Sequence, residues 1–384
     1  MREPLARRAL FACLGTGAVG LLVLGVQPLL YGALVASGRI TEAELGLLAA
    51  AEIAAIAGGS MIGVPMLARW PSWLVGLAGV ALLIVGDLGS IGQTGVAAIL
   101  GWRVVAGVGG GLLVALAAVA IARAPGISAA SAAFLLLQAL SQYAVLQWCA
   151  RPGAATGPDA VLTTLAGAAV LALALLALIP AALHPAPEHA QSGKASWPPL
   201  PGILALLAAA LFVGGAVGIW AYLGVWLAGR GLDDATVAAM LTASLGGQIG
   251  GAALGMAIGE RWDSRWRIAL LTVLLLGLVG SLFAGGSARA LIWAVVSAYG
   301  FVWMLATPAF SGFLLEVDAT RRALPYGAGA QLLGAAIMPL LAGALFGAVS
   351  LDGVLLACAA ACALSLATAL AASMLAASGD YLEA

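Results

Sequence analysis

Three charged residues lie well inside long apolar stretches of this 384-residue sequence: Glu52, Asp87 and Arg103. A charge at membrane depth costs at least about 2.5–3.5 kcal/mol, so such a side chain is a candidate for function. An arginine beside two acids permits proton exchange, because it holds one carboxylate ionised while the other, deprived of water, binds a proton. Asp87 lies nearest the outer interface, so we expect Glu52 to be the proton-coupling site, with Asp87 as the alternative. The competing interpretation is that Arg103 only ties its helix to a neighbour.

Uncharged polar and aromatic side chains in the same stretches indicate a site for an organic solute. Amides and aromatic faces suit a small, partly apolar molecule with a few hydrogen-bonding groups, and one buried cation favours a solute with a carboxylate. For any single Trp or Tyr, packing against lipid or core is the competing interpretation. The predicted solute-binding residues are Arg103, Gln27, Gln138, Gln142, Tyr143, Trp220, Tyr222, Gln248, Tyr299, Trp303 and Gln331.

Other kinds of chemistry find little support. The four cysteines lie in apolar runs, and the two histidines, His184 and His189, share a polar segment, so we expect no metal and no cofactor. The glycine run 107–111 lacks the lysine and the strand–turn–helix context of a phosphate loop. Zero net charge without lysine-rich blocks argues against nucleic acid as a partner. We therefore expect a protein that is not an enzyme.

The composition shows which elements must position these residues. Hydrophobic residues make up 63% of the chain and charged residues 8%, against about 25% charged in a soluble domain, so much apolar surface must face lipid. Continuous runs rich in Ala and Leu predict helices rather than a barrel. Breaks at charges, prolines and polar clusters leave twelve runs of spanning length: 9–36, 43–67, 73–92, 95–122, 127–150, 159–183, 200–228, 234–259, 268–286, 289–315, 323–349 and 351–377.

The distribution of cations orients the chain. With the N-terminus in the cytoplasm, eleven of the sixteen Lys and Arg residues fall on the cytoplasmic side and four on the outer side, as the positive-inside rule requires. We expect an integral multi-pass protein of a bacterial inner membrane with both termini cytoplasmic. Its expected partners are the bilayer, a small-molecule solute and H⁺ as coupling ion, and the chain is expected to be a monomer.

The chain repeats itself at half its length. Three pairs recur at offsets of 191 or 192 residues: Gly38-Arg39 with Gly229-Arg230, Arg69-Trp70 with Arg261-Trp262, and Trp102 with Trp293. A polar, proline-containing segment, 184–199, separates the copies. We predict an N-terminal six-helix bundle over 1–183, a cytoplasmic linker over 184–199 and a C-terminal six-helix bundle over 200–384.

Glycines recur every four residues on two predicted helices, at Gly59 and Gly63 and at Gly247, Gly251, Gly255 and Gly259. Small residues at this spacing let helices approach closely. The pattern predicts either a mobile seam between the two halves or tight packing of neighbouring helices.

These features together resemble the major facilitator superfamily. Arg103 followed by the glycines of 107–111 is similar to the family's signature in span 4, and 259–267 resembles a degenerate form of its acidic-basic loop. The resemblance implies an all-α membrane fold of twelve transmembrane helices in two pseudo-symmetric six-helix bundles, and secondary active transport by alternating access. It also implies a cytoplasmic gate made of Glu260, Arg261, Asp263, Arg265, Glu316, Asp318, Arg321 and Arg322.

The favoured hypothesis is proton-coupled transport of a small, partly hydrophobic organic solute, for which an anionic group is one option. The alternative is a drug or metabolite efflux antiporter, although the Gly-Pro that many drug/proton antiporters carry in span 5 is missing from 127–150. A non-transporting scaffold and a membrane-embedded enzyme are lower alternatives, since the sequence contains no large soluble domain and no concentrated catalytic motif.

Overall fold

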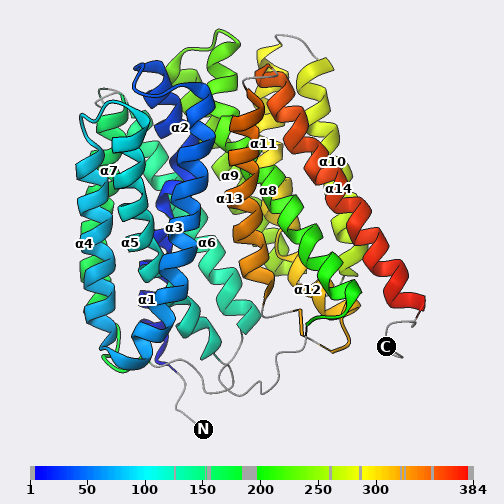
Figure 1. Ribbon diagram of the computed structural model, residues 1–384, viewed down its shortest axis with the longest axis horizontal. Coiled ribbons are helices and arrows are strands. Elements are labelled where there is room, and N and C mark those ends of the chain that lie inside the picture. Colours follow the sequence, from blue (N-terminus) through cyan, green and yellow to red (C-terminus); the bar gives the residue numbers. More distant parts are fainter. Residues whose placement is uncertain are drawn as a thin grey trace. The chain divides into compact units, whose positions relative to one another are not determined.

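The computed structural model describes residues 5–124, 127–151, 153, 157–183, 197–258, 262–284, 288–320, 322–323, 326–346 and 350–378. Throughout these residues the regular structure is helical, without strands, as Figure 1 shows. This confirms the predicted all-α class.

The helices follow the predicted apolar runs closely. In the first half of the chain they are α1 (Arg7–Gly20), α2 (Leu22–Ala36), α3 (Glu42–Arg69), α4 (Ser72–Ser90), α5 (Val96–Ala122), α6 (Ile127–Ala150) and α7 (Pro158–Leu176). In the second half they are α8 (Leu200–Gly229), α9 (Asp234–Ile258), α10 (Ser264–Ala284), α11 (Arg289–Ala306), α12 (Ala309–Val317), α13 (Gly327–Phe346) and α14 (Leu351–Ser378).

Eleven stretches of the described chain are long and apolar enough to cross a membrane. Two of them combine a pair of helices, α1 with α2 and α11 with α12. The shorter apolar helix Gly329–Leu345 lies within the predicted run 323–349. Each of the twelve predicted runs therefore contains an apolar helix.

Contacts within the chain group it into two compact units. One comprises Met1–Glu44 and Ala51–Gly193, and the other comprises Leu45–Ala50 and Lys194–Ala384. Most of the predicted linker, residues 184–196, lies outside the described residues, so the predicted domain boundaries stay a prediction.

Local sequence explains where several helices begin and end. Thr41 caps α3: its hydroxyl accepts from the Glu44 N–H, and the Glu44 carboxylate accepts from the Thr41 N–H at 2.8 Å. The predicted run 159–183 is too long, because α7 ends at Leu176, four residues before Pro180, and a proline disfavours helix in the residue before it. Pro308 likewise separates α11 from α12.

The first predicted span is broken at Leu21, between α1 and α2. No proline lies at the break. Instead the side-chain amide of Gln142, on α6, donates to the Leu21 carbonyl at 2.8 Å. A side chain inserted into the hydrogen-bond ladder is an established cause of a helix break. Gly25 makes room for it, since a Cβ there would lie 2.5 Å from Gln142 Cγ.

The glycine spacing reflects close packing of neighbouring helices within a unit. In the C-terminal unit, a Cβ built on Gly251 of α9 would lie 3.0 Å from the Phe301 carbonyl carbon of α11, and a Cβ on Gly247 would lie 3.0 Å from the Phe301 nitrogen. In the N-terminal unit, a Cβ on Gly59 of α3 would lie 3.0 Å from Val108 Cα of α5. These positions therefore support tight packing, the second of the two interpretations. Gly259 lies outside the described residues.

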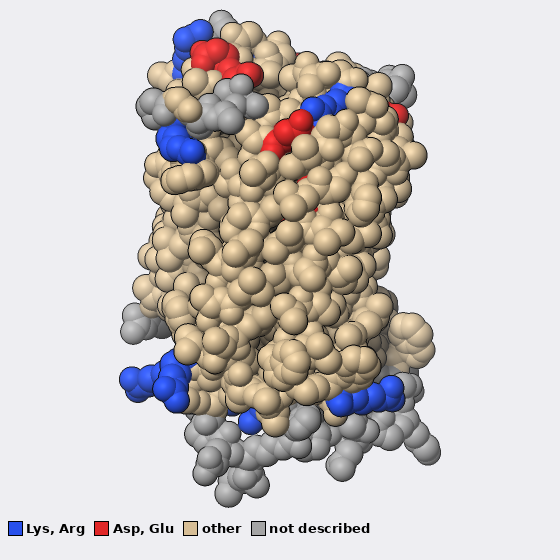
Figure 2. Space-filling view, turned by 90° about the vertical axis from the view of Figure 1, so that its left-hand side faces the viewer, with Lys and Arg blue, Asp and Glu red and all other residues tan. Residues whose placement is uncertain are grey.

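The surface agrees with a membrane location. Figure 2 looks at the side where α4 and α7 lie in Figure 1, and there Lys and Arg lie at both ends, whereas Asp and Glu lie toward the upper end. The wide band between the ends is almost entirely uncharged. Large apolar side chains such as Val85 of α4 and Leu171 of α7 are exposed, as is usual for side chains that face lipid.

Candidate functional site

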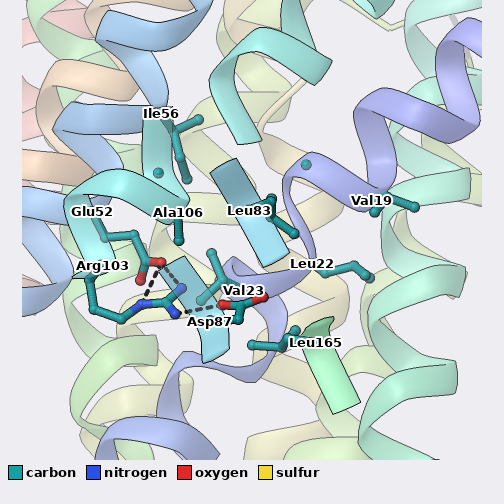
Figure 3. Close-up of a pocket in the computed structure, with 12 residues that line it drawn as sticks. Val19, Leu22, Val23, Glu52, Ile56, Leu83, Asp87, Arg103, Ala106 and Leu165 are labelled. Carbon is teal, nitrogen blue, oxygen red and sulfur yellow. Dashed lines mark hydrogen bonds and ion pairs between the residues drawn. The ribbon is translucent and has the colours of Figure 1, made fainter. Parts of the chain in front are cut away.

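The three predicted intramembrane charges form one buried cluster in the N-terminal unit. Arg103, on α5, lies between Glu52 on α3 and Asp87 on α4 (Figure 3). Arg103 Nη1 donates to Asp87 Oδ1 at 2.6 Å, and Arg103 Nε donates to Glu52 Oε1 at 2.9 Å. All three residues are at most 2% exposed. The structure therefore brings together the charges that the sequence singled out.

The two carboxylates differ in how their oxygens are used. Glu52 Oε1 accepts from both Nε and Nη2 of Arg103, and Glu52 Oε2 accepts from the hydroxyl of Tyr31 on α2. Asp87 Oδ1 accepts from Arg103, whereas Asp87 Oδ2 is buried without a hydrogen-bond partner among the described residues. One acid is thus saturated with donors and the other keeps a free oxygen.

Small residues let the three helices approach closely enough for these bonds. A Cβ built on Gly107 of α5 would lie 2.7 Å from both the Glu52 carbonyl oxygen and Ala55 Cβ of α3. A Cβ built on Gly86 of α4 would lie 2.5 Å from the Ala106 nitrogen of α5. The predicted glycine run after Arg103 therefore positions the charged cluster.

The repeat shows that the fold does not require these charges. At the repeat offsets of 192 and 191 residues, the positions of Glu52, Asp87 and Arg103 correspond in the second half to Ser244, Val279 and Ala294. All three counterparts are uncharged, although they lie on the equivalent helices of the second repeat. The cluster is therefore a property of one half of the molecule.

The predicted amides of the N-terminal unit are arranged around α2 and α6. Gln142 is buried and holds the Leu21 carbonyl, and Gln27 is fully buried with neither its amide nitrogen nor its oxygen bonded within the described part of the chain. Gln138 and Tyr143 are half-buried, and the Tyr143 hydroxyl accepts from Gln147 at 3.1 Å. Of this group, Gln27 is the residue whose amide atoms have no hydrogen-bond partner among the described residues.

In the C-terminal unit the structure brings three predicted aromatic residues together. The rings of Trp220 on α8 and Trp303 on α11 lie 6.3 Å apart, and those of Tyr299 and Trp303 lie 6.0 Å apart. The Tyr299 hydroxyl donates to the Ala216 carbonyl of α8 at 2.5 Å. Such ring pairs stabilise by about 0.5–1.5 kcal/mol beyond their buried area. We call Trp220, Tyr299 and Trp303 the aromatic cluster.

The other predicted residues of this unit differ in their surroundings. Tyr222 and Gln248 are buried, and Gln248 Nε2 has no partner among the described residues. Ser244, four residues before Gln248 on α9, likewise has an unbonded, buried hydroxyl within that part of the chain. Gln331, on α13, is half-buried. Gln248 and Ser244 thus present polar groups on one face of α9.

The predicted gate residues make mostly local contacts. Asp263 pairs with Arg265, whose hydrogen bonds hold the pKa of the exposed Asp263 carboxyl below its usual range. The Glu316 carboxylate accepts from the Ser264 N–H at 2.9 Å, at the start of α10. Asp318 is buried and accepts from the N–H groups of Thr320 and Ala323. Arg322 is exposed, and Glu260, Arg261 and Arg321 lie outside the described residues.

Sequence reasoning missed one member of the charged cluster, Tyr31. The available signal was its position four residues after Gln27, on the same helix face. Two ion pairs near helix ends were also missed. Arg39 binds Asp159 through two hydrogen bonds of 2.6 and 2.8 Å, and Arg230 binds Asp352 at 3.0 Å. The hydrogen bond to Asp159 raises the pKa of Arg39.

These two ion pairs follow the internal repeat. The arginines are 191 residues apart and the aspartates 193, and each aspartate lies in the first turn of the last helix of its half, α7 or α14. The two halves therefore share an equivalent ion pair as well as similar sequence.

No protein-family model and no curated protein sequence matches this chain. Solved structures match over nearly its whole length. A D-xylose-proton symporter aligns with a TM-score of 0.68 and 17% identity, covering 95% of each chain. The inward-open xylose transporter XylE from E. coli gives 0.68 and 16%, covering 95% of this chain and 94% of its own.

A variant of the nucleoside transporter NupG aligns with a TM-score of 0.70 and 13% identity, covering 95% of this chain and 100% of that one. At these identities the likeness concerns the fold. The chain shares the fold of these structures, which is the fold that the sequence resemblance implied.

Proposed function

We propose that this chain is a secondary active transporter that moves a small, partly hydrophobic organic solute across a membrane by alternating access, coupled to protons. The observation that carries the proposal is the buried cluster of Glu52, Asp87 and Arg103, which occurs in one half of a duplicated fold and is replaced by uncharged residues in the other. A cluster that costs free energy and is not needed for folding is retained for function.

The likeness of fold supports transport rather than a catalytic or scaffold role. The matched structures are those of a D-xylose-proton symporter and a nucleoside transporter. Their likeness to this chain is structural, and the cluster supplies the chemistry for proton coupling independently of it: two acids that share one guanidinium in a site without water can change their proton count.

The solute site is proposed from the uncommitted polar groups and the aromatic cluster. Within the described residues, Gln27 offers both buried atoms of its amide group without a hydrogen-bond partner, and Gln248 offers its amide nitrogen. The aromatic cluster offers apolar faces that suit a ring or a short hydrocarbon portion of a solute. An anionic solute would have to compete with Glu52 and Asp87 for Arg103, so we place the preference for a negative charge second to partial hydrophobicity.

The remaining parts of the proposal concern location and gating. The protein acts as a monomer in a bacterial inner membrane, with both termini in the cytoplasm. The loop that holds Asp263 and Arg265, together with Glu316 and Asp318, lies on the cytoplasmic side and rearranges as that side opens and closes. Efflux of a drug or metabolite in exchange for protons is the alternative direction.

The test is solute-dependent proton movement. Purified protein in weakly buffered detergent is titrated with a panel of metabolites and drugs, and active compounds are then offered to proteoliposomes that carry a pH gradient. We expect proton release or uptake on binding, and accumulation that requires the gradient. The matched control is the triple variant Glu52→Gln, Asp87→Asn, Arg103→Gln, which keeps the shape of the cluster without its charges. Accumulation by the triple variant would contradict proton coupling through this cluster.

A further inference from the structure

The charges of the buried cluster do not balance when both acids are ionised. Glu52 and Asp87 would each contribute one negative charge, Arg103 one positive charge and the Tyr31 hydroxyl none. All four side chains are at most 2% exposed. Because an unpaired charge that is removed from water is costly, a titratable group in such a place takes up or releases a proton instead. The cluster is therefore electrically neutral only when one of its two carboxyl groups is protonated.

Glu52 has no oxygen to spare for that proton. Oε1 accepts two N–H groups of Arg103, and Oε2 accepts the O–H group of Tyr31. A proton on Oε1 would displace an N–H group of Arg103, and a proton on Oε2 would require the Tyr31 hydroxyl to accept instead of donate. Hydrogen bonds to the charged form of a carboxyl group favour that form. The contacts therefore describe an ionised Glu52 paired with Arg103.

Asp87 offers the opposite situation. Its Oδ1 accepts one N–H group of Arg103, and its Oδ2 is buried without a partner in the described part of the chain. A proton on Oδ2 would break no existing bond. It would also convert an unsatisfied acceptor into a hydroxyl that can donate.

A small pocket receives this hydroxyl. Asp87 lines it together with Arg103 and Glu52, and it has room for about one water molecule. The remaining lining residues are apolar or glycine, and they include Val19 and Gly20 on α1, Leu22 and Val23 on α2, Leu83 on α4 and Leu165 on α7. Figure 3 shows Val23 and Leu165 beside the Asp87 carboxyl group. Water in this pocket can accept from Asp87 and from the N–H groups that Arg103 does not use in its described bonds.

Within the described part of the chain, the charged and titratable groups that face Asp87 are those of the cluster. α5 contributes Arg103, α3 contributes Glu52 and α2 contributes Tyr31, which reaches Glu52. From α1 and α7 the pocket receives Val19, Gly20 and Leu165, which do not titrate. The proton balance at Asp87 is therefore set by three named groups.

We infer that Asp87 carries the exchangeable proton on Oδ2 and donates a hydrogen bond through it to a single water molecule in this pocket, while Glu52 and Arg103 remain an ion pair. The role of this proton in transport rests on the proposed function. Its position on Asp87 does not, because that follows from the contacts and the charge count. The pocket adjoins the break between α1 and α2 at Leu21, since Gly20 and Leu22 both line it.

The position of the proton is tested by infrared difference spectroscopy on the full-length protein in lipid at neutral pH, recorded in H₂O and D₂O. Three samples are compared: unlabelled protein, protein with ¹³C-labelled aspartate carboxyls and protein with ¹³C-labelled glutamate carboxyls. We expect one carboxylic-acid C=O band that shifts with labelled aspartate and not with labelled glutamate. Asp87→Asn should remove the band, and Asp233→Asn, an exposed control outside the helices, should leave it unchanged.

Isotope labels are needed because Glu52→Gln cannot decide the question. Without Glu52, Asp87 becomes the sole counter-ion of Arg103 and ionises, so the band disappears in that variant as well. A band that shifts with labelled glutamate, a band that survives Asp87→Asn, or no carboxylic-acid band at all would each overturn the inference.

Failure of the proposed function is separable from this result. In proteoliposomes we expect Asp87→Asn, which imitates the protonated acid, to exchange solute between equal compartments and to lose accumulation driven by a pH gradient. If wild-type protein shows no gradient-driven accumulation while the aspartate band behaves as expected, proton coupling fails and the assignment of the proton stands. If wild-type protein accumulates solute and Asp87→Asn does so equally, the role of the Asp87 proton in coupling fails while proton coupling of transport stands.

Discussion

The hydroxyl of Tyr31 donates to the one oxygen of Glu52 that Arg103 does not bind. Tyr31 thereby completes the ionised state of Glu52 from a helix, α2, that lies beyond the break at Leu21. This contact decides which acid of the cluster has a free oxygen.

Tyr31→Phe removes the donor and leaves a buried carboxylate oxygen unsatisfied. Because a hydrogen bond to a charged group contributes about 1.5–3 kcal/mol, we expect thermal unfolding in detergent to report a loss of that order. The control is Tyr143→Phe, whose half-buried hydroxyl contacts Gln147, and it should change stability little. Equal stability of the two variants would show that the contact with Glu52 contributes nothing.

Arg103→Ala leaves two buried acids without their cation. Breaking a buried ion pair by removing one partner costs about 3–5 kcal/mol, so we expect poor expression or early unfolding. The triple variant Glu52→Gln, Asp87→Asn, Arg103→Gln removes all the charges and should recover most of that stability. Denaturant unfolding of both proteins measures the difference, and a triple variant no more stable than Arg103→Ala would contradict the electrostatic explanation.

Gly251 and Gly255 make a matched pair on one helix face. A Cβ on Gly251 would lie 3.0 Å from the Phe301 carbonyl carbon, whereas a Cβ on Gly255 would meet its nearest neighbour, Leu305 Cδ1, at 3.6 Å. We expect Gly251→Ala to destabilise the protein by about 1–3 kcal/mol, as overpacking does, and Gly255→Ala to be nearly neutral. Melting temperatures of the two variants test this, and similar values would show that α9 and α11 can separate at little cost.

The ion pair of Arg39 with Asp159 should contribute modestly, because both groups are partly exposed, 19% and 39%. We expect a double-mutant cycle with Arg39→Gln and Asp159→Asn to give a coupling energy of about 0.2–1 kcal/mol that falls as salt is added. The same cycle on Arg230 and Asp352 should behave alike, since the pair recurs in the second half. A coupling energy that does not respond to salt would mean that another contact holds these ends together.

The proposed orientation predicts which loops face each side of the membrane. In a variant whose four native cysteines are replaced by alanine, Arg230→Cys should react with an impermeant thiol reagent added to intact cells. Lys194→Cys should react only after the inner face is exposed. The reverse pattern would place the termini outside.

Much of the fold could be predicted because hydropathy and helix length are local properties. Charges and prolines interrupt the apolar runs, and so the ends of α3, α5 and α8 fall within a few residues of the predicted runs. The break at Leu21 could not be predicted, because its cause is an amide on α6, more than a hundred residues away. The end of α7 was readable in principle from Pro180.

The candidate site was partly predictable for a similar reason. A charge in an apolar run is visible in the sequence, and this identified Glu52, Asp87 and Arg103. Which oxygen each donor binds depends on how α2, α3, α4 and α5 pack, and the sequence carries no direct record of that. The preference for Glu52 as the proton-coupling acid rested on the predicted position of Asp87 in the membrane and stays a prediction, whereas the contacts support Asp87. The glycine spacing on α9 indicated close approach without showing that α11 is the partner.

The backbone contacts around α5 also have a mechanical consequence. Gly20 of α1, Gly59 of α3 and Gly79 of α4 all rest on the backbone of α5, so few side chains can rotate there to absorb a displacement. Close backbone contact of this kind favours movement of these helices as a group. Beyond the break at Leu21, α2 packs on α6 and α7. Any displacement of α2 relative to α3 would change the distance between Tyr31 and Glu52, so the hydrogen bond between them is a natural reporter of that displacement.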